Sequence, residues 1–298
     1  MDLKKFIYYK CRAIKVYVLA FIAPRKLANY YYKNIFGRSI NWKSPQDLNE
    51  WINVLMHSSD TSMWTLLADK YRVRQYIEKK GLSHILVPLL GVWNNPDKIE
   101  IDKLPDQFVI KSNNGNETVL LVDKNVYIPD LKSITKLWLR EKFGRTQCEP
   151  HYTKIPPLII AEKMLDTSKQ DIVSTSLIDY KIWCINGKPQ YVMTFHDRNK
   201  KTVTVNLFDT EWNRHNEDLV FGDHFICGHN IPKPNNLNEM LEIATILSEG
   251  FPQVRVDLYN VDNQIFFGEM TFSSNGGRMG YFSQRLLKEL GDKICISC

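Results

Sequence analysis

The chain has 298 residues, 44% of them apolar and 24% charged, so it is long enough to bury a large core, and its composition excludes disorder as the default state. Six scattered cysteines without a paired framework exclude a disulfide-stapled secreted fold and favour a reducing cytoplasm. The net charge of +6 is uneven, because residues 1–43 carry ten Lys or Arg against one acid, which leaves −3 on the rest of the chain. These bounds allow two domains or one elaborated α/β unit.

Residues 1–43 interleave their basic residues with aromatic and aliphatic ones. The longest apolar run, Val16 to Ala23, is too short to span a bilayer, and neighbouring basic residues interrupt any signal-peptide core. Such a segment suits a membrane headgroup layer, but a helical arm that packs on the body with its charges in water is the favoured interpretation. No nucleic-acid partner is expected, since no recognition motif accompanies the charge. We expect a cytoplasmic protein, with peripheral contact at the inner face of the membrane as the open alternative.

The next segment, residues 44–105, is predicted to be an N-terminal α/β region. Ser44 to Asp47 has the composition of a helix start. Apolar residues at helical spacing predict one amphipathic helix from Trp64 to Lys80, ended by Gly81. The run Ile85 to Val92 then predicts a buried strand.

The segment 106–165 begins with a strand, a polar loop and a second strand. Phe108 to Lys111 runs into the loop Ser112 to Thr118 and then into Val119 to Val122. A lysine that ends a strand ahead of such a loop can grip phosphate, because the ammonium supplies charge and the loop supplies N–H donors. An ordinary hairpin is the alternative and is favoured from this segment alone, since the GxxxxGK sequence of a P-loop is absent.

A helix is predicted from Ile128 to Phe143, and a buried strand from Leu158 to Ala161. The strand runs into Glu162 to Leu165, whose backbone N–H and C=O groups could hold an adenine ring.

The segment 166–298 contains the clearest hairpin of the chain, Asp179 to Tyr191, which turns at Asn186-Gly187, the signal of a type I′ turn. Alternation puts Asp179, Lys181 and Trp183 on one face of its first strand. A helix is predicted from Leu237 to Leu247.

Two groups of residues resemble metal ligands in type only. His224, Cys227 and His229 lack a fixed spacing, so a loop is favoured over a metal site. Cys295 and Cys298 form a CxxC without a second pair, which favours a fortuitous spacing.

The stretch Val254 to Gly277 predicts two strands joined by a tight polar turn. Arg255 and Asp257 share a face of the first strand. Alternation divides the second strand into one face with Ile265, Phe267, Glu269 and Thr271 and another with Phe266, Met270 and Phe272. Carboxylates among aromatic residues must be neutralised, so Asp257 and Glu269 should share a metal or meet arginine. Oxygen ligands without nearby Cys or His indicate magnesium, and an internal ion pair between Arg255 and Glu269 is an equally weighted alternative.

The length of the turn bears on this site. Asp257 and Glu269 are expected to face the same way only if the loop around Val261 to Asn263 contains an odd number of residues, whereas a two-residue turn would put them on opposite faces.

Five segments resemble, in order, the TupA-like branch of the ATP-grasp superfamily: LADKYRVRQYIEKK, VPLLGVW, LPDQFVIKSNNG, DYKIWCINGKP and VRVDLYNVDNQIFFGEMTF. The similarity covers roughly Asn41 to Gly280. It implies an α+β fold in which two α+β subdomains, residues 106–165 and 166–298, clasp ATP, the second with a metal-binding hairpin. The basic helical arm 1–43 and the α/β region 44–105 precede them.

The resemblance also implies roles for individual residues. Lys111 would contact the nucleotide phosphates, under a loop that includes Asn113, Asn114, Gly115, Asn116 and Thr118. The adenine would lie along Glu162, Lys163, Met164 and Leu165, with Asp171 or Asp166 at the ribose. Asp257 and Glu269 would bind magnesium, and Arg255 and Lys181 would be the catalytic basic residues.

The sequence departs from the family pattern at three places. Thr271 stands where an asparagine is usual, so either Thr271 or Asn275 would complete the metal site. Glu117 would repel phosphates unless it points away or binds magnesium, and the proline usual after the metal strand is missing.

The implied activity is that of an ATP- and magnesium-dependent carboxylate–amine ligase that works through an acyl phosphate. The expected substrates are an amino acid or other amine and the uronic-acid carboxyl of a bacterial surface polysaccharide or its precursor. A glycosyltransferase of the same pathway and a nucleotide-binding scaffold without chemistry are the alternatives.

Overall fold

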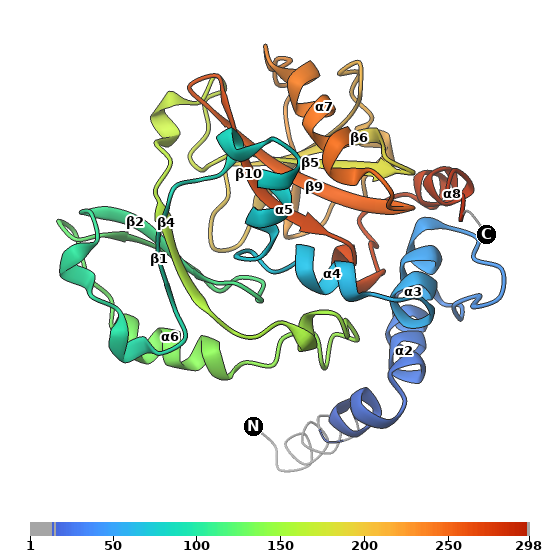
Figure 1. Ribbon diagram of the computed structural model, residues 1–298. Helices are drawn as coiled ribbons and strands as arrows, with labels where there is room; N and C mark the ends of the chain where they lie inside the picture. The colour runs from blue at the N-terminus through green and yellow to red at the C-terminus, as the bar shows by residue number, and fades with distance from the viewer. Residues whose placement is uncertain (1–13, 15, 297–298) are drawn as a thin grey trace.

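The computed structural model describes residue 14 and residues 16–296 and contains two sheets with helices packed around them (Figure 1). The small sheet has the order β1-β4-β2-β3, with β1 Leu89–Trp93, β2 Gln107–Ser112, β3 Val119–Asp123 and β4 Ile159–Lys163. The large sheet has the order β10-β9-β5-β6-β7-β8, with β5 Asp179–Ile185, β6 Lys188–His196, β7 Val203–Asp209, β8 Phe225–Cys227, β9 Gln253–Val261 and β10 Gln264–Thr271. Among these strands, neighbours are antiparallel except for β7 and β8.

The described α-helices are α2 Pro24–Phe36, α3 Leu48–Ser58, α4 Ser62–Leu67, α5 Val73–Lys79, α6 Leu131–Arg140, α7 Leu237–Ser248 and α8 Gln284–Asp292. The short 3₁₀ helices are η1 Ser83–Ile85, η2 Pro96–Lys98, η3 Ile101–Lys103, η4 Tyr152–Lys154, η5 Thr167–Lys169, η6 Asn216–Asp218 and η7 Ser274–Gly276.

The large sheet is covered on both faces. Helix α7 packs on one face, where its residues Leu237, Met240 and Ala244 are fully buried against alternate residues of β5 and β9. On the other face, α3 and α8 cover Trp183 and its neighbours but leave the part that carries Lys181 free of helices. A functional site can therefore form on this second face, beside the small sheet.

Most of the predicted elements are present, with two corrections. The hairpin of β5 and β6 turns at Asn186 and Gly187 with positive φ at both residues, as predicted. The single helix predicted from Trp64 to Lys80 is wrong, because it is broken between α4 and α5. The carboxylate of Asp69 accepts hydrogen bonds from the backbone N–H groups two and three residues later, which competes with a continuous helix.

The predicted strand from Ile85 to Val92 is also wrong in its first half. Residues Ser83–Ile85 form a 3₁₀ turn, and the strand β1 begins only at Leu89.

Helix α2 docks the arm on the body, as the favoured interpretation predicted for this part of residues 1–43. Its buried residues Leu27, Ala28 and Tyr32 pack against Ile40 and Cys148. The predictions for residues 1–13, 15 and 297–298, including the CxxC that ends at Cys298, lie outside the described residues.

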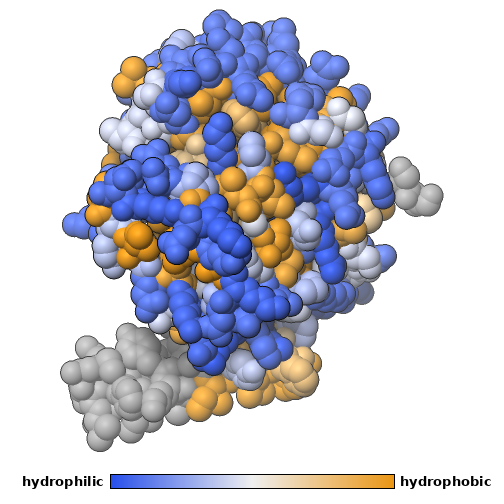
Figure 2. Space-filling model, turned by 60° about the vertical axis from the view of Figure 1, so that its left-hand side comes forward, coloured by the Kyte–Doolittle hydropathy of each residue, from blue (hydrophilic) through white to orange (hydrophobic). Residues whose placement is uncertain are grey.

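The outer side of the arm remains apolar. Tyr17, Val18, Phe21 and Ile22 are 53%, 46%, 77% and 68% exposed, and Figure 2 shows hydrophobic side chains gathered at the base of the molecule. Within the described residues, no helix has both the length and the apolar character that a membrane crossing requires.

Candidate functional site

The hairpin of β9 and β10 places Asp257 directly opposite Glu269. Its turn has two residues, Asp262 and Asn263, whose φ angles of 59° and 56° suit a type I′ turn. Turn length alone would put the two carboxylates on opposite faces. That expectation is wrong, because a β-bulge at Gly268 adds one residue to β10 and returns Glu269 to the face of Asp257.

The same bulge changes the predicted faces of the second strand. The core on the α7 side contains Ile265, Phe267, Met270 and Phe272. Glu269 and Thr271 lie on the opposite face, so the prediction that they share a face with Ile265 and Phe267 is wrong. A glycine inside a strand, here Gly268, is the sequence signal that could have predicted the bulge.

Arg255 is the centre of an ion cluster on this face. Its Nε and Nη2 donate to the two carboxylate oxygens of Asp257 at 2.6 and 2.7 Å, a bidentate arrangement. Nη2 also lies 3.0 Å from Glu269 Oε1, to which the Thr271 hydroxyl donates at 2.8 Å. The ion pair between Arg255 and Glu269, one of the two predicted ways to neutralise these acids, is therefore present.

Two lysines complete the cluster. Lys181, on β5, lies 2.6 Å from Asp257 Oδ2, and Lys70, in the break between α4 and α5, lies 3.6 Å from Glu269 Oε2. Burial would raise the pKa of Glu269, but Lys70, Arg255 and Lys181 outweigh it and hold this pKa well below its usual range. The carboxylate of Glu269 is therefore ionised at neutral pH.

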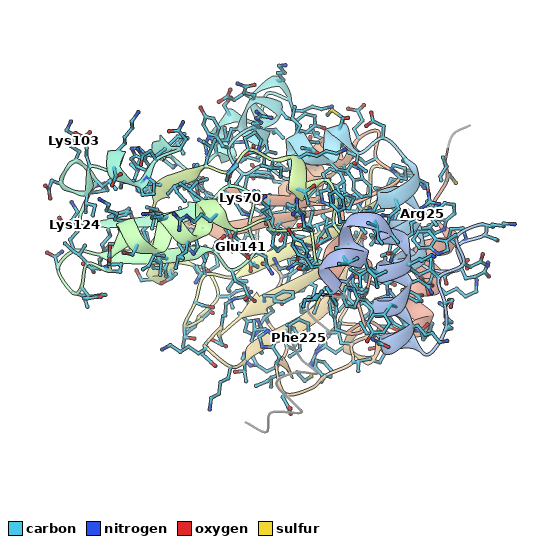
Figure 3. The ribbon with its side chains drawn as sticks, turned by 90° about the horizontal axis from the view of Figure 1, so that it is seen from below. Arg25, Lys70, Lys103, Lys124, Glu141 and Phe225 are labelled. Carbon is cyan, nitrogen blue, oxygen red and sulfur yellow. The ribbon has the colours of Figure 1, made fainter. Side chains whose placement is uncertain are left out.

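The small sheet contributes a second group of charges. Lys111 Nζ, on β2, lies 2.6 Å from Glu162 Oε2 on the neighbouring strand β4, and Arg74 lies 3.6 Å from the other oxygen of Glu162. Lys70 connects the two groups, because its Nζ donates to the carbonyl oxygen of Gly115 at 2.9 Å and also faces the large sheet. In Figure 3, Lys70 lies in the middle of the molecule, between the two sheets.

The predicted phosphate loop contains both buried residues, whose side chains stabilise the fold, and residues that a ligand can reach. Asn113 is fully buried, and its side chain bonds to Asp69, to Pro156 O and to the N–H of Leu158. Asn114 is also buried. Thr118 shares a hydrogen bond with Ser112, whereas Gly115 and Asn116 are accessible.

The predicted adenine segment follows the end of β4. Glu162 is buried in its ion pairs, Lys163 is exposed, and Met164 and Leu165 are partly exposed. Asp171 accepts a hydrogen bond from Asn260 at 3.3 Å near the turn of the β9–β10 hairpin.

The loop and the cluster line one cavity of about 360 Å³. The phosphate loop contributes Gly115, Asn116 and Glu117, and the hairpin and its continuation contribute Arg255, Glu269, Thr271, Ser273, Asn275 and Arg278. The third wall is the segment 141–152, with Glu141, Phe143, Gln147, Glu149 and Tyr152.

A sequence model of the family described as TupA-like ATPgrasp matches residues 50–295. The chain belongs to the TupA-like ATP-grasp family. It accordingly has an α+β ATP-grasp fold, as predicted.

Solved ATP-grasp ligases resemble this TupA-like chain at low identity. A D-alanine–D-alanine ligase from Bacillus anthracis is 17% identical, with 70% of this chain and 57% of the ligase covered and a TM-score of 0.39. The corresponding ligase from Helicobacter pylori is 12% identical, with 84% and 67% covered and a TM-score of 0.45, and an L-amino acid ligase from Bacillus licheniformis is 16% identical, with 77% and 45% covered and a TM-score of 0.41. The chain thus spans little more than half of the first ligase. A search of curated proteins gave no match.

The cluster of this TupA-like chain offers only oxygen donors, which suits a hard cation such as Mg²⁺. Glu269 is one third exposed and presents Oε2 with Lys70 no closer than 3.6 Å, and the Thr271 hydroxyl lies beside it. Asp257 is only 2% exposed, and both of its oxygens are bonded to Arg255 or Lys181. It could join a metal only after one of these contacts opens.

The residues of the site that the sequence did not predict include Lys70, Glu149, Ser273 and Arg278. Lys70 lies within the stretch that was predicted as one continuous helix. The only feature of the sequence that could have indicated its role is its place in the segment LADKYRVRQYIEKK, which resembles the family. The other three lie in irregular segments, for which neither helical nor strand periodicity gives a signal.

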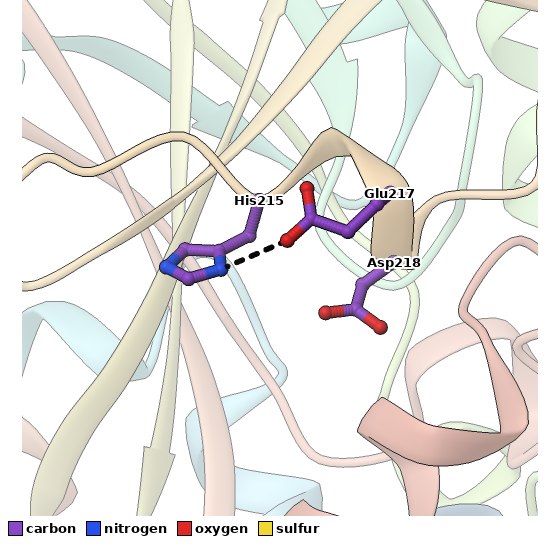
Figure 4. Close-up of side chains that lie close together, drawn as sticks. All are labelled: His215, Glu217 and Asp218. Atoms are coloured by element: carbon purple, nitrogen blue, oxygen red, sulfur yellow. Dashed lines mark hydrogen bonds and ion pairs between the residues drawn. The ribbon is translucent and has the colours of Figure 1, made fainter.

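Another set of metal-ligand types lies elsewhere, at His215, Glu217 and Asp218 (Figure 4). Asp218 is already bonded to Arg285 and to the Ser283 hydroxyl, so it has no free charge for an ion. No group of metal-ligand types that contains His224, Cys227 or His229 is found within residues 14 and 16–296. The predicted loop is wrong at Cys227, which is the last residue of strand β8, whereas His224 and His229 lie on either side of that strand.

Proposed function

We propose that this chain is an ATP- and Mg²⁺-dependent carboxylate–amine ligase that forms an amide bond through an acyl phosphate. The observation that supports this most directly is the shared cavity, which is lined by the phosphate loop at Gly115 and Asn116 and by the Arg255–Glu269 pair. A phosphoryl group in this cavity would meet the guanidinium groups of Arg255 and Arg278 on one side and the loop 115–117 on the other, and such positive charge stabilises phosphoryl transfer.

The position of each residue in the site indicates its role in the proposed reaction. Lys111, Lys70 and Lys181 surround the phosphates with positive charge while the substrate carboxylate attacks the γ-phosphorus of ATP. Mg²⁺, held by Glu269 and Asp257, would supply further charge neutralisation. Arg255 stabilises the oxyanion formed when the amine adds to the acyl phosphate, and the loop 112–118 limits access of water.

The family resemblance supports a substrate pair made of an amino acid and the uronic-acid carboxyl of a bacterial surface polysaccharide. The basic composition of residues 1–43 suits an anionic glycan or a lipid-linked precursor at the cytoplasmic face of the membrane.

Nucleotide binding tests the site directly. Calorimetry with ATP and Mg²⁺ should show binding that weakens at least tenfold in Lys111→Ala and in the double variant Asp257→Asn/Glu269→Gln. Lys124→Ala is the matched control, because this lysine lies at the outer end of the small sheet (Figure 3) and its ammonium donates to Leu104 O, away from the cavity.

Chemistry is tested by ADP release. Release that requires both a uronic acid and an amino acid supports the ligase. Turnover of a sugar nucleotide without ATP would instead support a glycosyltransferase of the same pathway, and nucleotide binding without carboxylate-dependent release would support a scaffold without chemistry.

Peripheral membrane contact is the remaining part of the proposal. Phe21 and Ile22 combine high exposure with a basic arm, so the chain should co-sediment with vesicles of phosphatidylglycerol more than with phosphatidylcholine. The variant Phe21→Ser/Ile22→Ser should lower this binding several-fold. Equal sedimentation of variant and wild type would contradict membrane contact through the arm.

A further inference from the structure

Arg278 is a positioned arginine that has no carboxylate partner among the described residues. Its Nη1 donates to Gln147 O at 3.0 Å, and its guanidinium lies 5.1 Å from the centre of the Tyr31 ring. Gly276 leaves room for it, because a Cβ at that position would lie 2.6 Å from Arg278 Nη2. An arginine that lines a cavity and is fixed in this way offers a binding site for an anionic group.

Glu149 is a buried acid on the third wall of the same cavity. It is 7% exposed, and its Oε1 accepts a hydrogen bond from the Ser273 hydroxyl at 2.5 Å. Burial raises the pKa of Glu149 to about 7, against the opposing effects of Ser273 and Arg278. His151 lies 3.3 Å from the same hydroxyl, and burial lowers its pKa to about 3, so it does not neutralise the acid.

The backbone around Glu149 is closely fitted. Gly144 has a φ of 88°, and a Cβ there would lie 2.4 Å from Glu149 O. The N–H of Glu149 donates to Gly144 O at 2.8 Å, which closes the loop, and the Ser273 hydroxyl holds the carboxyl group.

Among the described charged residues that line the cavity, Arg278 and Glu149 have no ion-pair partner of opposite charge. The lining acids are Glu117, Glu141, Glu149 and Glu269, and the lining bases are Arg255 and Arg278. Arg255 and Glu269 pair with each other, and Glu117 and Glu141 are exposed to solvent. What remains is one unpaired cation and one desolvated acid, which do not form an ion pair with each other. Their complement is a small zwitterion, since its anionic end suits Arg278 and its cationic end suits Glu149.

We propose that Arg278 and Glu149 form the subsite for an α-amino acid, whose carboxylate binds Arg278 and whose ammonium binds Glu149. This inference rests on the proposed ligase function and deepens it by assigning the residues that bind the two charged ends of the amino-acid substrate. A volume of about 360 Å³ is at the small end of ligand sites, which suits an amino acid beside one carboxyl group.

Glu149 would also accept a proton during formation of the amide bond. Its carboxylate takes one proton from the ammonium, and the nitrogen lone pair then attacks the carbonyl carbon of the acyl phosphate. The C–N bond forms, the C–O bond to phosphate breaks with its electron pair on the leaving phosphate, and the second nitrogen proton is lost to that phosphate. A group whose pKa lies near neutrality is suited to this transfer.

Binding by calorimetry tests the subsite without knowledge of the acid substrate. In the presence of Mg²⁺ and a non-hydrolysable ATP analogue, each of the proteinogenic amino acids is compared with its α-amide and with its des-amino acid. At least one amino acid should bind the wild type about tenfold or more tightly than its amide, and Arg278→Met should abolish this difference. Glu149→Gln should likewise abolish the preference for the amino acid over its des-amino counterpart.

Arg145→Met is the matched control. Arg145 lies in the same loop as Glu149 and stacks on Tyr17, but it does not line the cavity. It should keep both preferences. If no amino acid binds the wild type, or if Arg278→Met keeps the preference for the free carboxylate, the subsite is refuted.

A separate assay keeps the proposed function distinguishable from the subsite. With ATP, Mg²⁺ and D-glucuronate or D-galacturonate, hydroxylamine traps an acyl phosphate as a hydroxamate and has no carboxylate for Arg278 to bind. Hydroxamate formation should persist in Arg278→Met, while transfer to the amino acid is lost. Amino-acid binding as predicted without any hydroxamate would refute the acyl-phosphate step and still support the subsite, whereas equal loss of both products in Arg278→Met would refute the subsite.

Discussion

The substitution Arg255→Met removes the centre of the ion cluster while it keeps a side chain of similar length. Arg255 is 11% exposed and neutralises Asp257, which is 2% exposed, through two hydrogen bonds at 2.6 and 2.7 Å. In the variant, Lys181 still contacts Asp257 Oδ2 at 2.6 Å, but Oδ1 has lost its donor. The variant therefore leaves a partly uncompensated charge in a buried place.

Loss of one partner from a buried ion pair costs about 3–5 kcal/mol. Because Lys181 remains in place, we expect the lower end of this range, about 3 kcal/mol of unfolding free energy at neutral pH. The double variant Arg255→Met/Asp257→Asn removes both charges and should recover part of this loss. Arg140→Met, an exposed arginine at the end of α6, should change the free energy by less than about 0.5 kcal/mol.

The pH dependence has a definite sign. The pKa of Glu269 in the folded state is lowered, so its ionisation stabilises the fold above its unfolded value of 4.5, and that stabilisation is lost as pH falls toward the folded pKa. Arg255 is one of the cations that lower this pKa. The difference between wild type and Arg255→Met should therefore be largest above pH 4.5 and shrink below it.

Urea unfolding, followed by tryptophan fluorescence with and without Mg²⁺, measures these quantities. Trp183 reports on the site, since the Arg255 guanidinium lies 5.7 Å from its ring centre. Mg²⁺ should stabilise Arg255→Met more than the wild type, because the two acids are then free to bind it. A loss under 1 kcal/mol at pH 7, or the same loss in Arg140→Met, would refute this account of the cluster.

Three further predictions follow from local geometry. Asn113→Ala should lower the unfolding free energy by about 2–4 kcal/mol in urea titrations, because three buried hydrogen bonds are lost, whereas Asn116→Ala should leave stability unchanged and weaken only ATP binding by calorimetry. Gly268→Ala should cost about 1–2 kcal/mol by the same method, since its Cβ would lie 3.0 Å from Asp257 O, while Gly222→Ala, with no atom within 4 Å, should be neutral; equal effects would argue against a tight bulge. Glu149 has a raised folded pKa of about 7, so it destabilises the fold as pH rises from 4.5 to 7 by about 3 kcal/mol, and Glu149→Gln should flatten that decline in unfolding free energy; an unchanged slope would contradict the raised pKa.

Local periodicity predicted part of the site correctly. Asp179 and Lys181 lie on one face because alternation is a property of the strand itself, and the ion pair of Arg255 with Glu269 is one of the two arrangements expected for acids among aromatic residues. The five segments that resemble the family, taken in their order, predicted the ATP-grasp fold correctly.

What periodicity could not give depends on single irregular residues. Gly268 shifts the register by one residue, so every side chain beyond it changes face. The Asp69 carboxylate accepts hydrogen bonds from backbone N–H groups in the break between α4 and α5, and Lys70 in the same break contacts Gly115 and Glu269. Neither effect can be read from a pattern that assumes uninterrupted elements.

Glu149 and Arg278 were beyond reach for a different reason. They are 129 residues apart and lie in loops, so only the folded chain brings them to one cavity. A buried acid in a loop also resembles an exposed one in sequence, because burial here comes from Ser273 and its neighbours in a distant segment.

The two predicted ways of neutralising Asp257 and Glu269 are best understood as successive states. In the chain itself, the cations Arg255, Lys181 and Lys70 balance the acids Asp257, Glu269 and Asp179, so the cluster is close to neutral. A divalent cation alone would add excess positive charge beside three basic side chains, which is unfavourable in a poorly solvated site. In the proposed site, nucleotide phosphates would supply the missing negative charge and would give Lys181 and Lys70 new partners, so that carboxylate oxygens of Asp257 and Glu269 would be free to hold the metal. Mg²⁺ should therefore bind weakly to the wild type without nucleotide and tightly with it, and this coupling is what Arg255→Met would weaken.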